Sequence, residues 1–76
     1  NQINMNKSFE NKTINVLVET LTKDKSQFFG RTEFMTPVIF DGKEDCIGQI
    51  ISVKITSSNR SSLFGIQKDN LNKKVA

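Results

Sequence analysis

The clearest pattern along the chain is an alternation of apolar and polar residues in its second half. In the stretch IGQIISVKITS, residues 47–57, an aliphatic side chain recurs at nearly every second position. A period of two places successive side chains on opposite faces of a β-strand. We therefore predict one long strand here, with an inward face made of Ile47, Gln49, Ile51, Val53 and Ile55.

An earlier segment shows the same alternation and predicts a first strand over residues 12–20. The polar residues 21–26 follow, and residues 27–34, rich in phenylalanine and threonine, predict a second strand. The two strands would form a hairpin with a basic tip. The inward side chains predicted for the first strand are Ile14, Val16 and Val18.

Two shorter strands complete the pattern. Residues 38–40 are predicted to form a third strand entered through Pro37, because a proline cannot donate to a ladder and so belongs at a strand start or edge. Asp41 and Gly42 after it are a turn signal, since glycine adopts positive φ at little cost. Residues 62–67 are predicted to form the last strand.

Five short strands without an amphipathic helix between them predict an all-β fold, a small five-stranded antiparallel barrel. Closing the sheet removes the exposed edges that invite aggregation. We expect the barrel domain over residues 11–67, and a C-terminal tail over 68–76. Residues 1–10 are too polar to bury much, and we interpret them as a linker or the end of a preceding helix. Because the chain begins with Asn1 instead of methionine, we expect a piece of a longer protein.

Composition limits the function classes. The chain has 76 residues, enough for one domain but not for a large catalytic cleft. Hydrophobic residues make up 36%, and no apolar run approaches the ~20 residues that span a bilayer, so we expect a globular unit without a membrane partner. The net charge of +3 is compatible with a polyanionic partner, although much of the excess lies after residue 66.

The chemistry-bearing residues are few. A single cysteine, Cys46, and no histidine exclude an intrachain disulfide and an ordinary zinc or iron–sulfur site, and favour a reducing cytoplasm. We interpret Cys46 as a small packing residue. No paired carboxylates in a plausible cleft and no phosphate-cradling glycine loop are present, so we expect no catalytic residues and no catalysis from this chain alone.

Four motifs in order carry a resemblance to a known family: NVLVE, GRTEFMTPVIFDG, IGQIISVKIT and SLFG. Together they resemble the TRAM domain, most closely the version at the C-terminus of the radical-SAM methylthiotransferases that modify tRNA, the MiaB family. Asn11 departs from the glycine often found there. Pro37 is more typical of relatives that modify a ribosomal protein, whereas Thr32 and Phe40 favour the tRNA enzymes.

The resemblance implies a barrel similar to the OB fold that binds RNA as an accessory. It would help to position the anticodon stem-loop of tRNA for an active site elsewhere, which modifies an adenosine next to the anticodon. The implied partners are tRNA and the catalytic domain of the same parent chain, with no DNA expected. The parent would use two [4Fe-4S] clusters and S-adenosylmethionine, whose cysteine motifs are absent from this chain.

Arg31 is the strongest candidate for RNA contact, because a guanidinium can both fork onto a phosphate and stack on a base. Gly30 beside it leaves one side of the strand unshielded, which predicts close approach by a ligand backbone. The alternative, which does not exclude RNA contact, is a structural ion pair or a capping role. The partner in such an ion pair would be Glu33 on the same strand face or Glu19 opposite.

The other candidates are cations at predicted turns or outward strand positions and one aromatic residue. The predicted RNA-binding set is Arg31, Lys23, Lys25, Lys54, Arg60 and Phe29. Alternation places Phe28 and Phe34 on one face of the second strand and Phe29 with Arg31 on the other, so one pair belongs to the core. With no tryptophan or tyrosine, recognition of backbone and shape is favoured over base reading.

Two other functions stay open. A protein-docking domain, as in the relatives that modify a ribosomal protein, would ignore RNA. A structural appendage of the catalytic domain would be favoured if the outward faces were apolar at Leu17 and Ile50.

Overall fold

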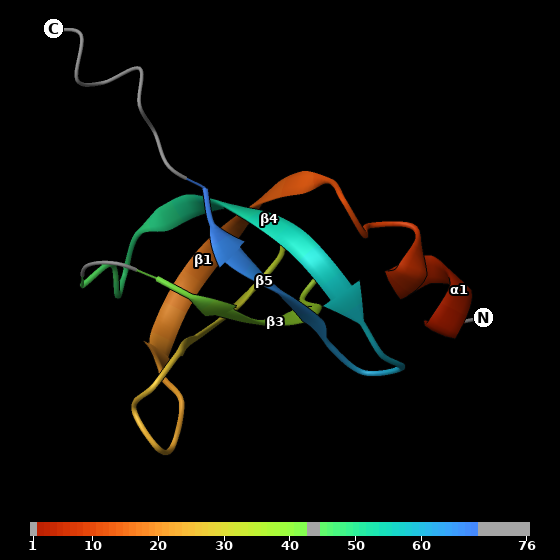
Figure 1. Ribbon diagram of the computed structural model, residues 1–76. Coiled ribbons are helices and arrows are strands. Elements are labelled where there is room, and N and C mark those ends of the chain that lie inside the picture. The colour runs from red at the N-terminus through yellow and green to blue at the C-terminus, as the bar shows by residue number, and fades with distance from the viewer. Residues whose placement is uncertain (1, 43–44, 69–76) are drawn as a thin grey trace, which may run out of the picture.

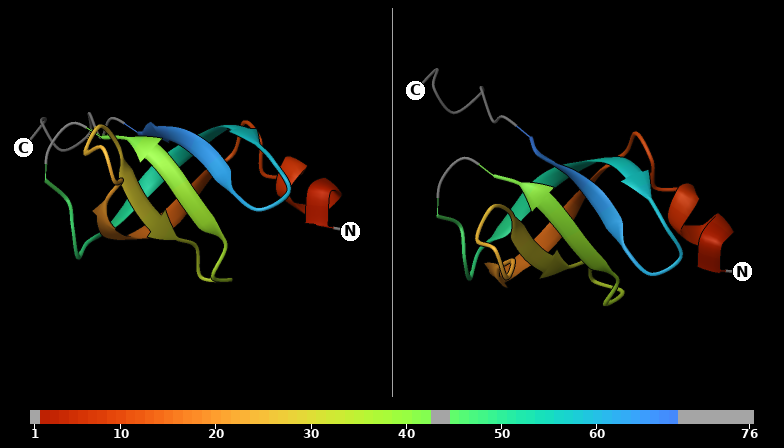
Figure 2. Two further views of the ribbon diagram at one scale, coloured as in Figure 1. Left: turned by 90° about the horizontal axis from the view of Figure 1, so that it is seen from below. Right: turned by 60° about the horizontal axis from the view of Figure 1, so that its bottom comes forward.

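A computed structural model of the chain describes residues 2–42 and 45–68. Its strands wrap around one interior as a closed barrel, in the order β1-β2-β3-β5-β4 (Figures 1 and 2). The predicted five-stranded barrel is confirmed. Of the predicted tail, residues 69–76 lie outside the described residues. The elements are α1 (Gln2–Lys7), β1 (Thr13–Leu21), β2 (Phe28–Arg31), β3 (Pro37–Asp41), β4 (Ile50–Ser58) and β5 (Leu63–Gln67).

One pair of strands departs from the antiparallel arrangement expected. β3 and β5 run parallel, with Val38 opposite Leu63, while the other four pairs are antiparallel. The cause is geometric: strands that alternate in direction around a closed ring must be even in number. A barrel of five strands therefore contains at least one parallel pair.

The inward faces follow the predicted alternation. Side chains from all five strands fill the interior, and the rings of Phe28 and Phe40 stack with centroids 5.6 Å apart. Cys46 packs among them, as predicted for a small packing residue. The buried apolar side chains are Val16, Val18, Phe28, Val38, Phe40, Cys46, Val53, Ile55 and Leu63.

The long strand starts later than the alternation predicted. β4 begins at Ile50, and the predicted inward residues Ile47 and Gln49 are exposed in the turn before it. Gly48 adopts a φ of 88° there, and the backbone N–H of Gln49 donates to the carbonyl of Cys46 at 3.0 Å. Turn chemistry therefore overrides the alternation at this end of the strand.

The second strand ends earlier than predicted, at Arg31. The Thr32 hydroxyl accepts hydrogen bonds from the backbone N–H groups of Phe34 at 3.1 Å and Thr36 at 3.3 Å, which folds the chain into a loop. Phe34 is 72% exposed in this loop, while Phe28 is in the core. The prediction that both rings share one strand face is therefore wrong, because the strand does not reach Phe34.

Gly30 has a packing role instead of the ligand approach predicted for it. It is buried on the inward side of β2. A Cβ atom on it would lie 2.3 Å from the carbonyl oxygen of Leu17 and 2.7 Å from a methyl of Val16. Only glycine therefore allows β2 to approach β1 this closely.

The N-terminal segment contains a short helix that packs against β4. Asn6 is fully buried, and its Nδ2 donates to the carbonyls of Asn59 at 2.8 Å and Arg60 at 3.1 Å. The expectation that this segment buries little is wrong at Asn6, because an amide can be buried when it is hydrogen-bonded. Asn11 has a φ of 71°, a left-handed conformation that asparagine tolerates, which explains the departure from glycine there.

Candidate nucleic-acid interface

Arg31 is held by an acid on the neighbouring strand. Its Nη1 donates to both carboxylate oxygens of Glu19 on β1, at 3.1 and 3.0 Å. This confirms the predicted partner Glu19, whereas Glu33 lies in the β2–β3 loop and does not share a strand face with Arg31. The side chains are 38% and 34% exposed, so the pair contributes at most about 1 kcal/mol to folding.

Phe29 supports the same guanidinium from a second direction. The Arg31 Cζ lies 5.4 Å from the Phe29 ring centroid, within the range of a cation–π contact. Nε and Nη2 of Arg31 have no hydrogen-bond partner within the described part of the chain. Glu19 and Phe29 therefore fix the orientation of Arg31 and leave donors for a ligand.

The tip of the β1–β2 hairpin presents Lys23 and Lys25, both exposed. The turn is organised by Asp24, whose Oδ1 accepts from the Ser26 backbone N–H at 3.0 Å, the Ser26 hydroxyl at 2.8 Å and the Thr22 hydroxyl at 2.9 Å. These hydrogen bonds, first that from the Ser26 backbone, lower the pKa of Asp24. Asp24 therefore carries its charge between the two lysines and reduces the positive field of the tip.

The two remaining predicted cations lie apart from this hairpin. Lys54 is exposed on β4, opposite Thr13, so β1 separates it from Arg31 on β2. Arg60 is exposed in the β4–β5 loop, which lies beside α1 at the opposite end of the barrel from the hairpin tip (Figure 1). The structure thus brings Phe29 and Arg31 into contact, and places Lys23 and Lys25 on the same hairpin.

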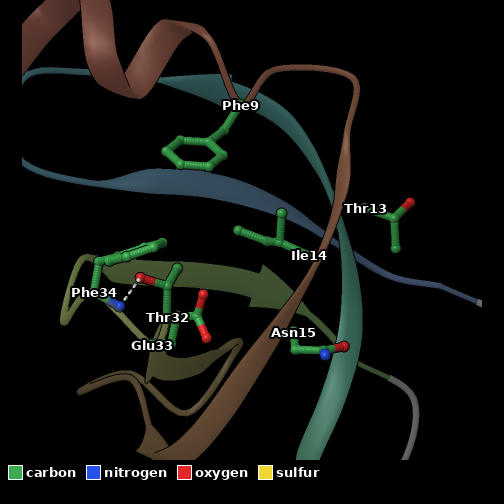
Figure 3. Close-up of a pocket in the computed structure, with 7 residues that line it drawn as sticks. All are labelled: Phe9, Thr13, Ile14, Asn15, Thr32, Glu33 and Phe34. Atoms are coloured by element: carbon green, nitrogen blue, oxygen red, sulfur yellow. Dashed lines mark hydrogen bonds between the residues drawn. The ribbon is translucent and has the colours of Figure 1, made fainter.

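A pocket that the sequence did not predict lies beside the β2–β3 loop (Figure 3). We call it the Phe34 pocket; its volume is ≈ 320 Å³. Phe9, from the segment between α1 and β1, is half-buried against the core, while Phe34 is exposed. A sequence signal exists, because Phe34 lies three residues before Pro37, the residue that opens β3, so a break in the second strand was to be expected there. The lining residues are Phe9, Thr13, Ile14, Asn15, Thr32, Glu33 and Phe34.

A second hollow, the Arg31 groove, adjoins this pocket. It has a volume of ≈ 420 Å³ and shares Asn15, Thr32 and Glu33 with the Phe34 pocket, so the two form one continuous surface. Leu17 on β1 lines the groove and is paired in the sheet with Arg31 on β2 and with Ile50 on β4. The lining residues are Asn15, Leu17, Glu19, Arg31, Thr32, Glu33, Met35 and Ile50.

The described residues offer no metal centre. Among residues 2–42 and 45–68, no three His, Cys, Asp or Glu side chains gather where they could hold a metal ion. Burial, and secondarily the negative charge of Asp45, raise the pKa of the Cys46 thiol, which disfavours the thiolate that binds iron. The residues here therefore do not fit an iron–sulfur cluster. Within the same ranges, no helix has the length and apolar character needed to cross a membrane.

Comparison with known proteins decides the family. The model of the TRAM domain family matches residues 7–67, which is most of the chain. The chain belongs to the TRAM domain family. The five strands of the barrel, with Gly30 and Arg31 on β2 and Thr32 directly after it, lie within the matched range.

Several proteins similar to this TRAM domain are larger and share one name, tRNA-2-methylthio-N(6)-dimethylallyladenosine synthase. That of Pelagibacter ubique (strain HTCC1062) is 57% identical over 76 residues, which are 100% of this chain and 17% of the relative. That of Clostridium novyi (strain NT) is 44% identical over 61 residues, 79% of this chain and 14% of the relative. The resemblance to the tRNA methylthiotransferases is confirmed, and the chain spans about a sixth of the first relative.

Proposed function

We propose that this TRAM domain is an RNA-binding accessory that helps to position the anticodon stem-loop of tRNA for a methylthiotransferase acting on an adenosine next to the anticodon. The names of the relatives support the substrate class. The observation that carries the proposal is the orientation of Arg31, held between Glu19 and Phe29 with free donors. A guanidinium fixed in this way loses little freedom when it meets a phosphate or a base.

The proposed interface begins at the hairpin tip and runs along β2. Lys23 and Lys25 would contact the phosphate backbone, Arg31 a phosphate or base, and Phe29 would support Arg31 instead of offering an open stacking face. Lys54 and Arg60 lie apart from this interface and would contact an RNA only if it wrapped around the barrel. Because Asp24 and Glu19 lie among these cations, we expect weak binding by the domain, strengthened by linkage to a second site.

Catalysis would belong to the rest of the parent protein. The two [4Fe-4S] clusters and S-adenosylmethionine expected for the parent would supply radical chemistry outside this chain, whose single cysteine is buried. The chain itself would bind and orient RNA in the cytoplasm.

The proposal is tested by NMR titration of the labelled domain with a tRNA anticodon stem-loop at low and physiological salt. We expect shifts at Lys23, Lys25 and Arg31 that weaken with salt, because phosphate contacts release counterions. Arg31→Gln should weaken binding about fivefold to tenfold, which corresponds to about 1 to 1.4 kcal/mol, and change the free energy of unfolding by at most about 1 kcal/mol.

Lys68→Gln is the charge-matched control, since Lys68 is exposed and lies outside the proposed interface. It should leave the affinity nearly unchanged. Equal losses in the two variants would indicate a non-specific charge effect and reject a role for Arg31. An absence of shifts at either salt would reject RNA binding by the domain.

A second candidate function rests on the apolar floor of the Arg31 groove. Leu17 and Ile50 are adjacent in the sheet and 46% and 69% exposed, and Met35 is exposed beside them. This is the apolar outward face expected of an appendage docked on the catalytic domain of the same parent chain. A docking role toward another protein is the remaining alternative.

The docking candidate predicts a different variant effect. Ile50→Lys should leave the domain folded, because the side chain is exposed, and should weaken its binding to the separately produced catalytic domain in calorimetry. Arg31→Gln should have little effect in that assay. If Ile50→Lys binds as well as the unchanged domain, the groove is not the docking surface.

A further inference from the structure

The most exposed aromatic ring outside the predicted set belongs to Phe34. At 72% exposure, it gains little from the hydrophobic effect in folding. It faces the Phe34 pocket together with Phe9, which reaches the pocket from another segment (Figure 3). An aromatic side chain that contributes little to the core is available to a ligand.

The loop that carries Phe34 is held in one conformation. Thr32 is buried, and its hydroxyl accepts from the N–H groups of Phe34 and Thr36. Its backbone carbonyl accepts from Met35 at 2.8 Å, and its N–H donates to Thr36 at 3.0 Å. Met35 has a φ of 68°, a conformation that costs a residue other than glycine some free energy. These contacts preorganise the position of Phe34.

The lining of the Phe34 pocket fits a base better than a phosphate. Its volume of ≈ 320 Å³ is at the small end of ligand pockets, which start at about 300 Å³. The charged residue among its lining is Glu33, an anion that would repel a phosphate. A carboxylate accepts hydrogen bonds and does not donate, so it selects a ligand with N–H donors. Asn15 adds an amide that can donate and accept.

We propose that the Phe34 pocket binds one unpaired nucleobase, which stacks on Phe34 and donates hydrogen bonds to Glu33. Guanine fits best, because its Watson–Crick edge presents two adjacent N–H donors to the two carboxylate oxygens. This inference rests on the proposed RNA-binding function and deepens it. Stacking on an aromatic ring and hydrogen bonding at the base edge are the means by which proteins recognise unpaired RNA bases.

The position of Arg31 supports this occupant. The Arg31 groove and the Phe34 pocket share three lining residues, so a strand of RNA can contact both. Arg31 would meet the phosphate beside the bound base, and Phe34 the base itself. This division matches the general pattern in which phosphate contacts position an RNA and base contacts specify it.

The test is an NMR titration of the 76-residue chain with the pentaribonucleotides UUGUU, UUAUU, UUCUU and UUUUU. We expect the tightest binding for UUGUU, upfield shifts of the guanine base proton from the ring current, and shifts of the Phe34 ring. Phe34→Ala should weaken binding of UUGUU about tenfold, equal to about 1.4 kcal/mol, and remove the upfield shift. Since Phe34 is exposed, this variant should have the same melting temperature as the unchanged chain.

Two further variants make the result specific. Ile66→Ala truncates an exposed apolar side chain on β5 and should not affect binding. Glu33→Gln should reduce the preference for UUGUU over UUUUU while keeping the stacking shift, because glutamine offers one acceptor where glutamate offers two.

The outcomes separate this inference from the proposed function. One outcome is that the stem-loop binds, but the Phe34→Ala variant has the same affinity for every pentamer as the unchanged chain. The base site is then wrong and RNA binding stands. If the pentamers shift Phe34 while the stem-loop does not bind, the base site stands and the positioning of tRNA fails. If no pentamer binds, or if the shifts avoid the pocket, the inference is overturned.

Discussion

Replacing Gly65 with alanine is expected to destabilise the barrel by about 3 kcal/mol. A Cβ atom at this position would lie 2.1 Å from the backbone carbonyl oxygen of Lys54 and 2.9 Å from its carbon. Backbone atoms in the β4–β5 ladder cannot move aside without breaking hydrogen bonds between these strands. A domain of this size has a total stability of about 4 to 11 kcal/mol, so the loss is large. Urea denaturation followed by circular dichroism measures it.

Ser52→Ala is the matched control for the Gly65 variant, because Ser52 is an exposed residue on the neighbouring strand β4. It should change the free energy of unfolding by less than about 0.5 kcal/mol. A Gly65→Ala variant as stable as this control would show that β4 and β5 are not packed as closely as described.

Asn6→Asp is expected to cost about 3 kcal/mol at neutral pH. The Nδ2 group of Asn6 donates to two backbone carbonyls in the β4–β5 loop, and a carboxylate cannot donate to either. The change leaves both acceptors facing a buried negative charge. Because Phe9 follows α1 and lines the Phe34 pocket, loosening α1 should also weaken binding of the pentaribonucleotides.

Asn59→Asp is the same chemical change at a residue with the opposite role. The Oδ1 of Asn59 accepts from the backbone N–H groups of Ser61 at 2.9 Å and Ser62 at 2.8 Å, and an aspartate oxygen accepts equally well. This variant should stay within about 0.5 kcal/mol of the unchanged chain. Similar losses in both variants would contradict the donor role assigned to Asn6.

The alternation of residue types was enough to predict the elements of the barrel and most of its interior. Val16, Val18, Val53 and Ile55 were placed inward from the period of two alone, and all are buried. A local pattern suffices because the pleat of a strand places alternate side chains on opposite faces wherever the strand lies. The ion pair between Arg31 and Glu19 was predictable as one of two options, since only the pairing of strands selects the partner.

The errors have two origins, hydrogen bonds within turns and contacts between segments distant in the sequence. Thr32 ends β2 by bonding its own loop, which changes Phe34 from an expected strand residue into an exposed ring. Gly30 is glycine because β1 passes close to it. Asn6 is buried because a loop more than 50 residues later brings it two carbonyls. Alternation predicts which face of a strand a side chain takes, and local turn hydrogen bonds decide where a strand begins or ends. Close backbone approaches and buried polar contacts depend on which segments become neighbours when the barrel closes.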